Sequence, residues 1–155
     1  MFNQVLTRAL SRADLPAVSK VVEQTGMFPS EMLPDMVEPF LARSADHRWI
    51  VVVEGDAVIG FAYSEPERMT DNTHNLLAIA VTPDRQGQGF GKRLVHAIKA
   101  ALKEQGGRVL LVETSSLPEF AGARAFYDGL GFAREALIRD FYAEGEDKVL
   151  FWRKL

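Results

Sequence analysis

A glycine-rich stretch, Gln86-Gly-Gln-Gly-Phe-Gly91, has the residue types and spacing that most clearly predict a chemical task in this sequence. Glycine lets the backbone approach a bound anion closely and adopt angles that other residues avoid. An apolar run precedes the stretch and a helical pattern of apolar residues follows it, so its N–H groups open a predicted helix. Those N–H groups have no partners inside the helix, and the helix dipole adds positive charge there. With Lys92 and Arg93 beside them, they predict a site for phosphate or pyrophosphate.

Other kinds of glycine loop fit the stretch less well. A Walker loop needs Ser or Thr after Gly-Lys, and here Arg93 follows Gly91-Lys92. A dinucleotide-binding loop needs G-x-G-x-x-G directly after a strand, whereas this one reads G-x-G-x-G and starts behind Pro83-Asp84. Glu113, at the end of the next predicted strand, would imitate the acidic ribose ligand of that fold, so a nucleotide-binding domain stays open. The other alternative is that these glycines bind no ligand and only make a tight connection between the strand and the helix.

Two motifs together resemble the GNAT superfamily of N-acetyltransferases. The stretch from Gln86 to Gly91 matches the [QR]-x-x-G-x-[GA] coenzyme A loop of that family, and Val81-Thr-Pro83 is similar to its lead-in. Downstream, Ala123-Arg-Ala-Phe-Tyr-Asp-Gly-Leu-Gly-Phe132 is similar to the family's A-x-x-F-Y-x-x-x-G-F segment. The resemblance implies acetyl-CoA as co-substrate and direct transfer of its acetyl group to a primary amine in a ternary complex. That amine would belong to an amino acid, a small metabolite or a protein terminus.

The resemblance also implies a geometry for the cofactor. One strand would pair with the pantetheine arm, and the loop N–H groups would wrap the pyrophosphate. The cofactor-binding residues expected on this basis are Ile79, Ala80, Val81, Gln86, Gly87, Gln88, Gly89, Phe90, Gly91, Lys92, Ser115 and Phe126. The strands Asn75–Val81 and Val109–Thr114 would splay apart to form the slot for acyl group and acceptor. Many members carry Asn where this chain has Phe120, and Ser115 or Ser116 is the expected substitute.

Two residues are candidates for acid–base catalysis. Tyr127 matches the family's tyrosine and would donate a proton to the departing thiolate, unless it is a core tyrosine with a satisfied hydroxyl. Glu113 ends the run Val-Leu-Leu-Val, and a lone carboxylate is costly to bury unless it is paired or functional. Glu113 is therefore the candidate base. It could instead pair with a lysine or arginine, emerge into solvent where the strand ends, or bind the acceptor's ammonium. The N–H groups of Ala80 or Val81 are candidates for holding the oxyanion.

For several other polar residues, the sequence gives weaker support for a role in catalysis or in binding the acceptor. His74 titrates in a useful range, but an exposed loop histidine is the simpler expectation, and His47 and His96 are expected to be structural. The acceptor pocket would lie between one group formed by Tyr63, Glu65 and Arg68 and another formed by Arg139, Asp140, Phe141 and Tyr142. The sequence holds no His, Asp and Glu cluster with metal-ligand spacing, so we expect no metal. It also lacks the G-x-S-x-G elbow of a serine nucleophile.

Hydrophobic periodicity and the positions of glycine and proline predict the helices and strands that must position these residues. The predicted order is strand, two helices, three strands, helix, strand, helix and two strands. Asp14 is predicted to cap the first helix, with Pro16 in its first turn. This order predicts an α/β fold with a mixed, mostly antiparallel central sheet of about seven strands and helices on both faces. The second helix, Ser30 to Arg43, is Met-rich and contains Pro39, which should kink or split it. It is either a core-packing helix or a movable wall over a site. The run Asn75–Val81 suits a strand buried on both faces.

Composition limits the remaining possibilities. The 155 residues fit one domain spanning 1–155, with 47% hydrophobic and 25% charged residues. A formal net charge of -3 gives no reason to expect nucleic acid or an anionic membrane as partner. Cysteine is absent, and no apolar run resembles a signal peptide or a membrane helix. We expect a cytoplasmic enzyme with a small-molecule or peptide amine as acceptor, with a homodimer as one option. A non-catalytic acyl-CoA-binding or sensing domain is the main rival.

Overall fold

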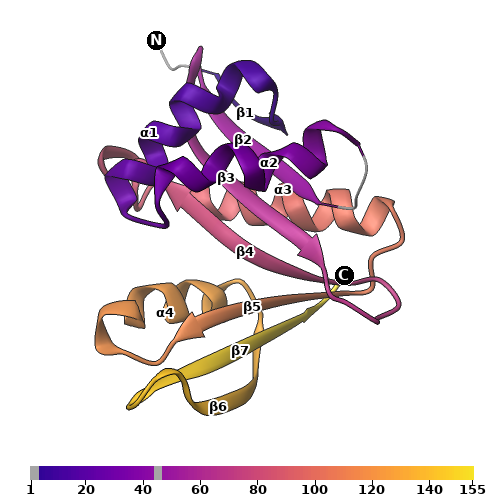
Figure 1. Cartoon of the computed structure of the whole chain (residues 1–155), viewed down its shortest axis with the longest axis vertical. Coiled ribbons are helices and arrows are strands. Elements are labelled where there is room, and N and C mark those ends of the chain that lie inside the picture. The colour runs from indigo at the N-terminus through magenta and orange to yellow at the C-terminus, as the bar shows by residue number, and fades with distance from the viewer. Residues whose placement is uncertain (1–3, 44–46) are drawn as a thin grey trace. The chain divides into compact units, whose positions relative to one another are not determined.

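The computed structural model describes residues 4–43 and 47–155, so Met1–Asn3 of the N-terminal segment lie outside it. Seven strands form one mixed sheet in the order β1-β2-β3-β4-β5-β7-β6 (Figure 1). The pairs β1–β2, β2–β3, β5–β7 and β6–β7 are antiparallel, and β4–β5 is parallel. This arrangement confirms the predicted fold class and order of elements. In chain order the elements are β1 (Val5–Ala9), α1 (Leu15–Thr25), α2 (Leu33–Leu41), β2 (Arg48–Glu54), β3 (Ala57–Pro66), β4 (Thr73–Val81), α3 (Phe90–Glu104), β5 (Val109–Ser115), α4 (Ala121–Gly129), β6 (Ala133–Ala143) and β7 (Glu146–Lys154).

The described chain packs as two compact units. Unit 1 comprises the described residues up to Glu65 and Leu77–Ala101, and unit 2 comprises Pro66–Leu76 and Leu102–Leu155. The extent of the domain, expected to be one over 1–155, stays a prediction. Each unit is built around its own buried side chains, and each carries a different group of the candidate residues.

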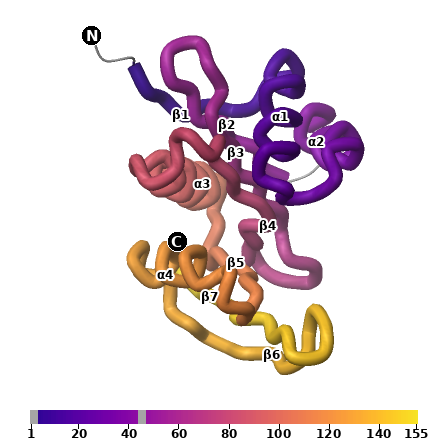
Figure 2. Tube along the Cα trace, turned by 90° about the vertical axis from the view of Figure 1, so that its left-hand side faces the viewer, coloured from indigo at the N-terminus to yellow at the C-terminus, as the bar shows by residue number. Residues whose placement is uncertain are grey.

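Unit 1 places two helices against its strands. Gly26 ends α1 with a φ of 64°, a left-handed angle that glycine adopts readily. Figure 2 shows α1 and α2 on one face of the strands of this unit and α3 on the other. The core between the strands and α1 and α2 is apolar because alternate strand residues point to that face. It includes Val18, Val22, Leu33, Val37, Trp49, Val51, Phe61 and Tyr63.

Unit 2 is a small sheet covered by α4. Strand β7 pairs with β5 from Lys154–Val109 to Lys148–Ser115. The first residues of β4, Thr73 to Leu76, pair in parallel with Val109 to Val112. Its core is aromatic and aliphatic, with Leu110, Val112, Tyr127, Phe132 and Phe151 buried. Strand β6 is exposed along its whole length.

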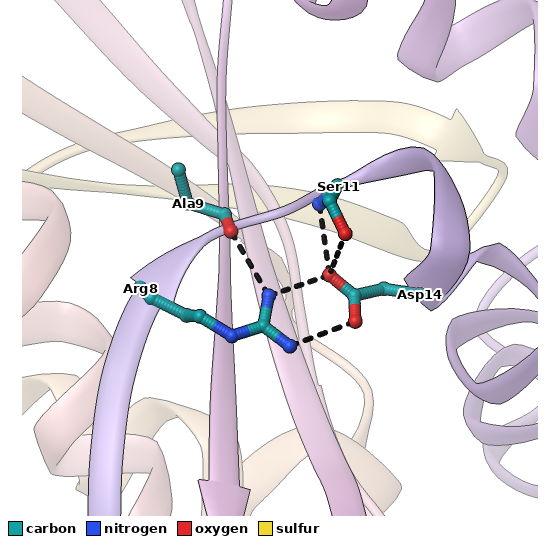
Figure 3. A network of polar contacts seen from close by, with 4 residues as sticks. All are labelled: Arg8, Ala9, Ser11 and Asp14. Atoms are coloured by element: carbon teal, nitrogen blue, oxygen red, sulfur yellow. Dashed lines mark hydrogen bonds and ion pairs between the residues drawn. The ribbon is translucent and has the colours of Figure 1, made fainter.

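Three local predictions were wrong. Asp14 stands at the start of α1 but makes no capping hydrogen bond to it. Its carboxylate binds Arg8 and Ser11 instead, because the chain turns there and brings both back to it (Figure 3). Helix α2 runs without a break from Leu33 to Leu41, so Pro39 does not split it. A kink at Pro39 stays a prediction. Strand β4 is not buried on both faces, since Leu77 is 43% exposed.

The sequence left two interpretations of α2, a core-packing helix or a movable wall over a site, and its packing bears on both. Leu33 and Val37 are buried, and Met36 packs on the core of unit 1, so α2 supplies core contacts. Met32, just before the helix, is 49% exposed. Movement of this segment over a site stays a prediction.

Candidate functional site

The glycine loop joins β4 to α3 within unit 1. Gly87 and Gly89 have φ values of 76° and 89°, which favour glycine. The Arg93 N–H donates to the Gly89 carbonyl at 3.2 Å and starts the helical hydrogen bonding, so the preceding amides lie outside the ladder. Residues 86–89 are exposed, while the Phe90 ring is buried and anchors the helix start. An exposed row of backbone donors at a helix N-terminus fits a pyrophosphate.

Side chains brace this loop against the end of β4. Gln86 Nε2 donates to the Val81 carbonyl at 2.9 Å, so the motif glutamine holds the loop to the strand. Arg85 Nε donates to Glu54 Oε1 at 2.9 Å and ties the loop to the β2–β3 hairpin. Lys92 and Arg93 are exposed at the helix start. These two hydrogen bonds hold the loop against the end of β4 and against the hairpin. Lys92 and Arg93 take no part in them.

The last residues of β4 lie very close to β3. A Cβ on Gly60 would lie 2.7 Å from the Ala80 carbonyl oxygen and 3.3 Å from Val81 Cα, so only glycine fits there. The Ala80 carbonyl therefore points toward β3. In a trans peptide the next N–H points the opposite way, and no peptide bond in the described residues is cis. The Val81 N–H is thus directed away from β3, and of the two oxyanion candidates it is the one that this geometry favours.

Tyr127 lies in α4 and is 5% exposed. Its ring contacts Phe126, Phe132 and Phe151 at centroid distances of 5.1, 5.6 and 5.5 Å. Burial raises the pKa of its phenol, so the hydroxyl is protonated at neutral pH. Among the residues that the structure describes, no hydrogen bond engages this hydroxyl. The side chain is thus a core tyrosine whose hydroxyl keeps its capacity to donate.

Glu113 lies on β5 with its side chain 28% exposed. Its Oε1 accepts hydrogen bonds from Lys148 Nζ at 2.9 Å and from Asn75 Nδ2 at 3.2 Å. The carboxylate is therefore paired with a lysine, one of the alternatives left open by the sequence. Lys148 also places its ammonium 4.0 Å from the centroid of the Phe141 ring.

The serines near the end of β5 already have partners in the chain. Ser115 Oγ accepts from the Leu117 N–H at 3.1 Å, and its carbonyl accepts from Arg124 Nη1 at 2.5 Å. Ser116 Oγ accepts from the Asp147 N–H at 2.8 Å. Phe120, where many members carry Asn, is 41% exposed. A cofactor role for Ser115 or Ser116 stays a prediction.

The first group of acceptor candidates divides between the units. In unit 1, Tyr63 donates to Glu65 Oε2 at 2.7 Å, and His47 Nε2 lies 3.3 Å from the same oxygen. The pKa of Tyr63 is raised by burial and by Glu65. Arg68 belongs to unit 2 and is exposed. The structure thus brings Tyr63, Glu65 and His47 together.

The second group lies at the end of β6 rather than in a loop. Phe141 and Tyr142 are 50% and 44% exposed, and their rings meet edge to face with centroids 5.0 Å apart. Asp140 has a φ of 53°, its N–H donates to Asp147 Oδ1, and its own Oδ1 accepts from the Gly145 N–H. Burial, then Glu113 and Glu146, raises the pKa of Tyr142. Tyr142 therefore lies within the electrostatic reach of Glu113.

The sequence did not identify Glu67, Asn75 or Lys148 as site residues, and it misplaced His74. His74 is 1% exposed, because it lies within β4 rather than in a loop. Asn75 and Lys148 are also buried, at 3% and 8% exposure. A polar residue directly before the apolar runs that start at Leu76 and Val149 is the signal that would have identified both.

The fold and the loop define a class of α/β protein that binds a ligand with a pyrophosphate, and comparison with known proteins defines the family. Residues 15–132 match the model of the Acetyltransferase (GNAT) family. The chain belongs to this family and is an acetyl-CoA-dependent acetyltransferase. This finding confirms the resemblance inferred from the two motifs.

Individual relatives agree with this assignment. A crystal structure of a GNAT-family protein from Desulfovibrio desulfuricans has a TM-score of 0.89 and 32% identity, covering 97% of this chain and 99% of its own. The ribosomal protein bS18-alanine N-acetyltransferase of Escherichia coli K12 is 26% identical over 136 residues, which cover 86% of this chain and 84% of that protein. N-alpha-acetyltransferase 30 of Schizosaccharomyces pombe is 27% identical over 122 residues, with 73% and 80% covered.

Among the helices of residues 4–43 and 47–155, none combines the length and the apolar character needed to cross a bilayer. A cytoplasmic location stays a prediction.

Proposed function

We propose that this protein transfers the acetyl group of acetyl-CoA to a primary amine that attacks the thioester directly. The observation that carries the proposal is the glycine loop at the start of α3, whose exposed amides and left-handed glycines suit a pyrophosphate. Acetyl-CoA, when bound, supplies the acetyl group as an activated thioester. Absence of cysteine from the sequence agrees with direct transfer, which needs no covalent enzyme intermediate.

Backbone groups of unit 1 would hold the cofactor and the developing negative charge. The amides from Gln86 to Lys92 would bind the pyrophosphate, with Lys92 adding positive charge. Ile79, Ala80 and Val81 would pair with the pantetheine arm as a neighbouring strand does. The Val81 N–H, directed away from β3, would donate to the oxyanion that develops on the thioester carbonyl.

Two side chains of unit 2 would move protons. Tyr127 would donate its phenolic proton to the departing sulfur, a role supported by its place in the family motif and by its unengaged hydroxyl. The raised pKa keeps that proton on the phenol until the thiolate forms. Glu113 would take the proton that the attacking amine loses. In the balance, the N–C bond forms, the C–S bond breaks, and coenzyme A leaves as the thiol.

The acceptor that we propose to test first is the α-amine of a polypeptide. The names of two relatives, a ribosomal protein alanine N-acetyltransferase and an N-alpha-acetyltransferase, support this choice. Small-molecule amines are the alternative class, since one fold serves many acceptors.

A thiol-release assay with acetyl-CoA tests the function. Peptides with a free N-terminus should release coenzyme A, whereas the same peptides with a blocked N-terminus should not. Free amino acids and diamines complete the panel. Release with no member of the panel, together with tight acetyl-CoA binding, would instead support a non-catalytic acyl-CoA-binding domain.

A binding measurement tests the cofactor separately. Acetyl-CoA and coenzyme A should raise the melting temperature, because a ligand that binds only the folded state stabilises it. NAD and ATP should leave it unchanged. Stabilisation by NAD or ATP alone would contradict the proposal.

A further inference from the structure

An arginine on α4 joins that helix to the end of β5 within unit 2. Arg124 Nη1 donates to the Ser115 carbonyl at 2.5 Å and to the Leu117 carbonyl at 3.0 Å. Ser115 is the last residue of β5, and Leu117 lies in the connection between β5 and α4. Among the residues that the structure describes, these are the hydrogen bonds that join α4 to β5 or to this connection. One half-buried side chain therefore links the two elements.

The connection that Arg124 binds is itself bonded to β7. The Ser116 N–H donates to the Asp147 carbonyl at 2.9 Å, and the Asp147 N–H donates to Ser116 Oγ at 2.8 Å. Ser115 Oγ also accepts from the Leu117 N–H at 3.1 Å. Because these contacts hold the two carbonyls in place, Arg124 ties α4 to a fixed part of the sheet.

Both ends of the link lie close to the acid–base candidates. Glu113 precedes Ser115 by two strand residues, which is about 7 Å along the chain. Tyr127 follows Arg124 by three helix residues, so the two side chains are neighbours on the surface of α4. The link between Arg124 and Ser115 therefore sets the position of the phenol along β5.

The other contacts of Tyr127 do not set this position by themselves. Its ring packs on three aromatic rings, and apolar packing is non-directional. Within the described residues, no hydrogen bond holds its hydroxyl. The directional contact closest to it along α4 is the one that Arg124 makes. The family motif A-x-x-F-Y leaves residue 124 open, so the resemblance does not assign this arginine.

We infer that Arg124 is a positioning residue, which holds α4 on β5 so that the Tyr127 hydroxyl reaches the departing sulfur. The inference rests on the proposed function, because it takes Tyr127 as the acid. A misplacement of about 1 Å at a catalytic group can lower the rate by about 100-fold. Lysine at this position keeps N–H donors for the two carbonyls, whereas methionine keeps the apolar stem and has none.

Kinetics of thiol release test the inference. Arg124→Met should lower kcat by about tenfold to 100-fold and leave the KM for acetyl-CoA within about twofold of wild type. Arg124→Lys should recover most of the lost kcat. Asp128→Asn is the matched control, because Asp128 joins the same helix to β6 through an ion pair with Arg134 at 2.7 Å. This control should keep kcat within about twofold of wild type.

Fluorine NMR of the chain labelled with 3-fluorotyrosine reports on Tyr127 without turnover. The sequence contains three tyrosines, so Tyr127→Phe assigns its resonance. Arg124→Met should broaden or split this resonance, because α4 then takes up more than one position on the sheet. Arg124→Lys and Asp128→Asn should each keep one narrow line.

The outcomes separate this inference from the proposed function. One narrow Tyr127 line in Arg124→Met would overturn the inference, as would equal losses of kcat in Arg124→Met and Asp128→Asn. Thiol release by the wild type combined with either result would leave the proposed function intact. A broadened line in Arg124→Met alone, in a protein that releases thiol with no amine, would support the positioning and contradict the proposed function alone.

Discussion

The guanidinium of Arg8 binds both carboxylate oxygens of Asp14, with nitrogen–oxygen distances of 2.6 and 2.8 Å. The Ser11 N–H donates to the same carboxylate at 2.8 Å and the Ser11 hydroxyl donates at 3.1 Å, so three groups meet on one side chain (Figure 3). The Asp14 side chain is 8% exposed. This contact fixes the path from β1 into α1.

The stability of the protein should depend on pH through Asp14. The hydrogen bond from Arg8 holds the pKa of this carboxyl below its usual range. A lowered pKa in the folded state stabilises the protein above the unfolded value of about 3.9, and this stabilisation is lost as pH falls through the folded value. Asp14→Asn should therefore lower the free energy of unfolding by about 1–2 kcal/mol at pH 7. The difference from wild type should shrink below pH about 4.

Urea unfolding of both proteins between pH 3 and 7 measures this difference. Glu38→Gln is the control, because Glu38 pairs with Arg12 at 3.4 Å with both side chains largely exposed. That substitution should change stability by less than about 0.5 kcal/mol. A difference for Asp14→Asn that does not depend on pH would contradict the prediction.

Gly60→Ala should destabilise the protein and weaken acetyl-CoA binding. The added Cβ would meet the Ala80 carbonyl oxygen at 2.7 Å, and backbone has little freedom to move away. We expect a loss of about 1–3 kcal/mol in the free energy of unfolding. The displaced strand end carries the proposed oxyanion donor, so thermal unfolding and calorimetric acetyl-CoA binding should both register the change.

Gly122→Ala is the matched control for this substitution. Gly122 lies in α4 with nothing within 4 Å of a built Cβ. Alanine there should raise stability by about 0.4–1 kcal/mol because it restricts the unfolded chain. Equal effects of the two substitutions would show that the clash with Ala80 is not the cause.

Gly89→Ala should weaken acetyl-CoA binding because it strains the backbone, not because the added methyl group clashes with a neighbour. A Cβ at Gly89 meets nothing within 4 Å, but the φ of 89° is one that alanine rarely adopts. We expect the Kd for acetyl-CoA to rise about fivefold to tenfold, as a strain of about 1 kcal/mol implies. Calorimetric titration measures this value.

Gly26→Ala introduces similar strain at a distant place in the sequence. Gly26 ends α1 with a φ of 64° and open space around it. This variant should lose stability and keep its affinity for acetyl-CoA. An equal loss of affinity in both variants would point to general destabilisation instead of a role for the loop.

Tyr127→Phe should remove turnover and keep cofactor binding. The hydroxyl makes no hydrogen bond within the described part of the chain, so its loss should leave the melting temperature nearly unchanged. We expect kcat to fall by about 100-fold or more, the contribution of a positioned acid. Thiol release and acetyl-CoA titration on the same preparation measure both quantities, and a kcat within about twofold of wild type would exclude Tyr127 as the acid.

Much of the candidate site could be predicted from the sequence because its signals are local. The apolar run before Val81, the glycines from Gly87 to Gly91 and the helical spacing after them predict a strand, an anion loop and a helix without knowledge of any distant residue. The structure has β4 and α3 at these places. The element order follows for the same reason, since hydrophobic periodicity is set within each segment.

What the sequence left open depends on partners that are far apart along the chain. Glu113 could be predicted to need a partner, but its partner Lys148 is 35 positions away and Asn75 is 38 positions away. Asp14 had the sequence of a helix cap, yet Arg8 and Ser11 provide stronger partners for a buried carboxylate.

The sequence by itself therefore determined the family, the cofactor loop and the two acid–base candidates, because short motifs and local periodicity encode them. Only the tertiary structure decided that His74 is buried, that Val81 directs its N–H away from β3, and that an ammonium already lies against Glu113. These features arise when strands pair and side chains from separate segments meet, and no single stretch of sequence contains that information.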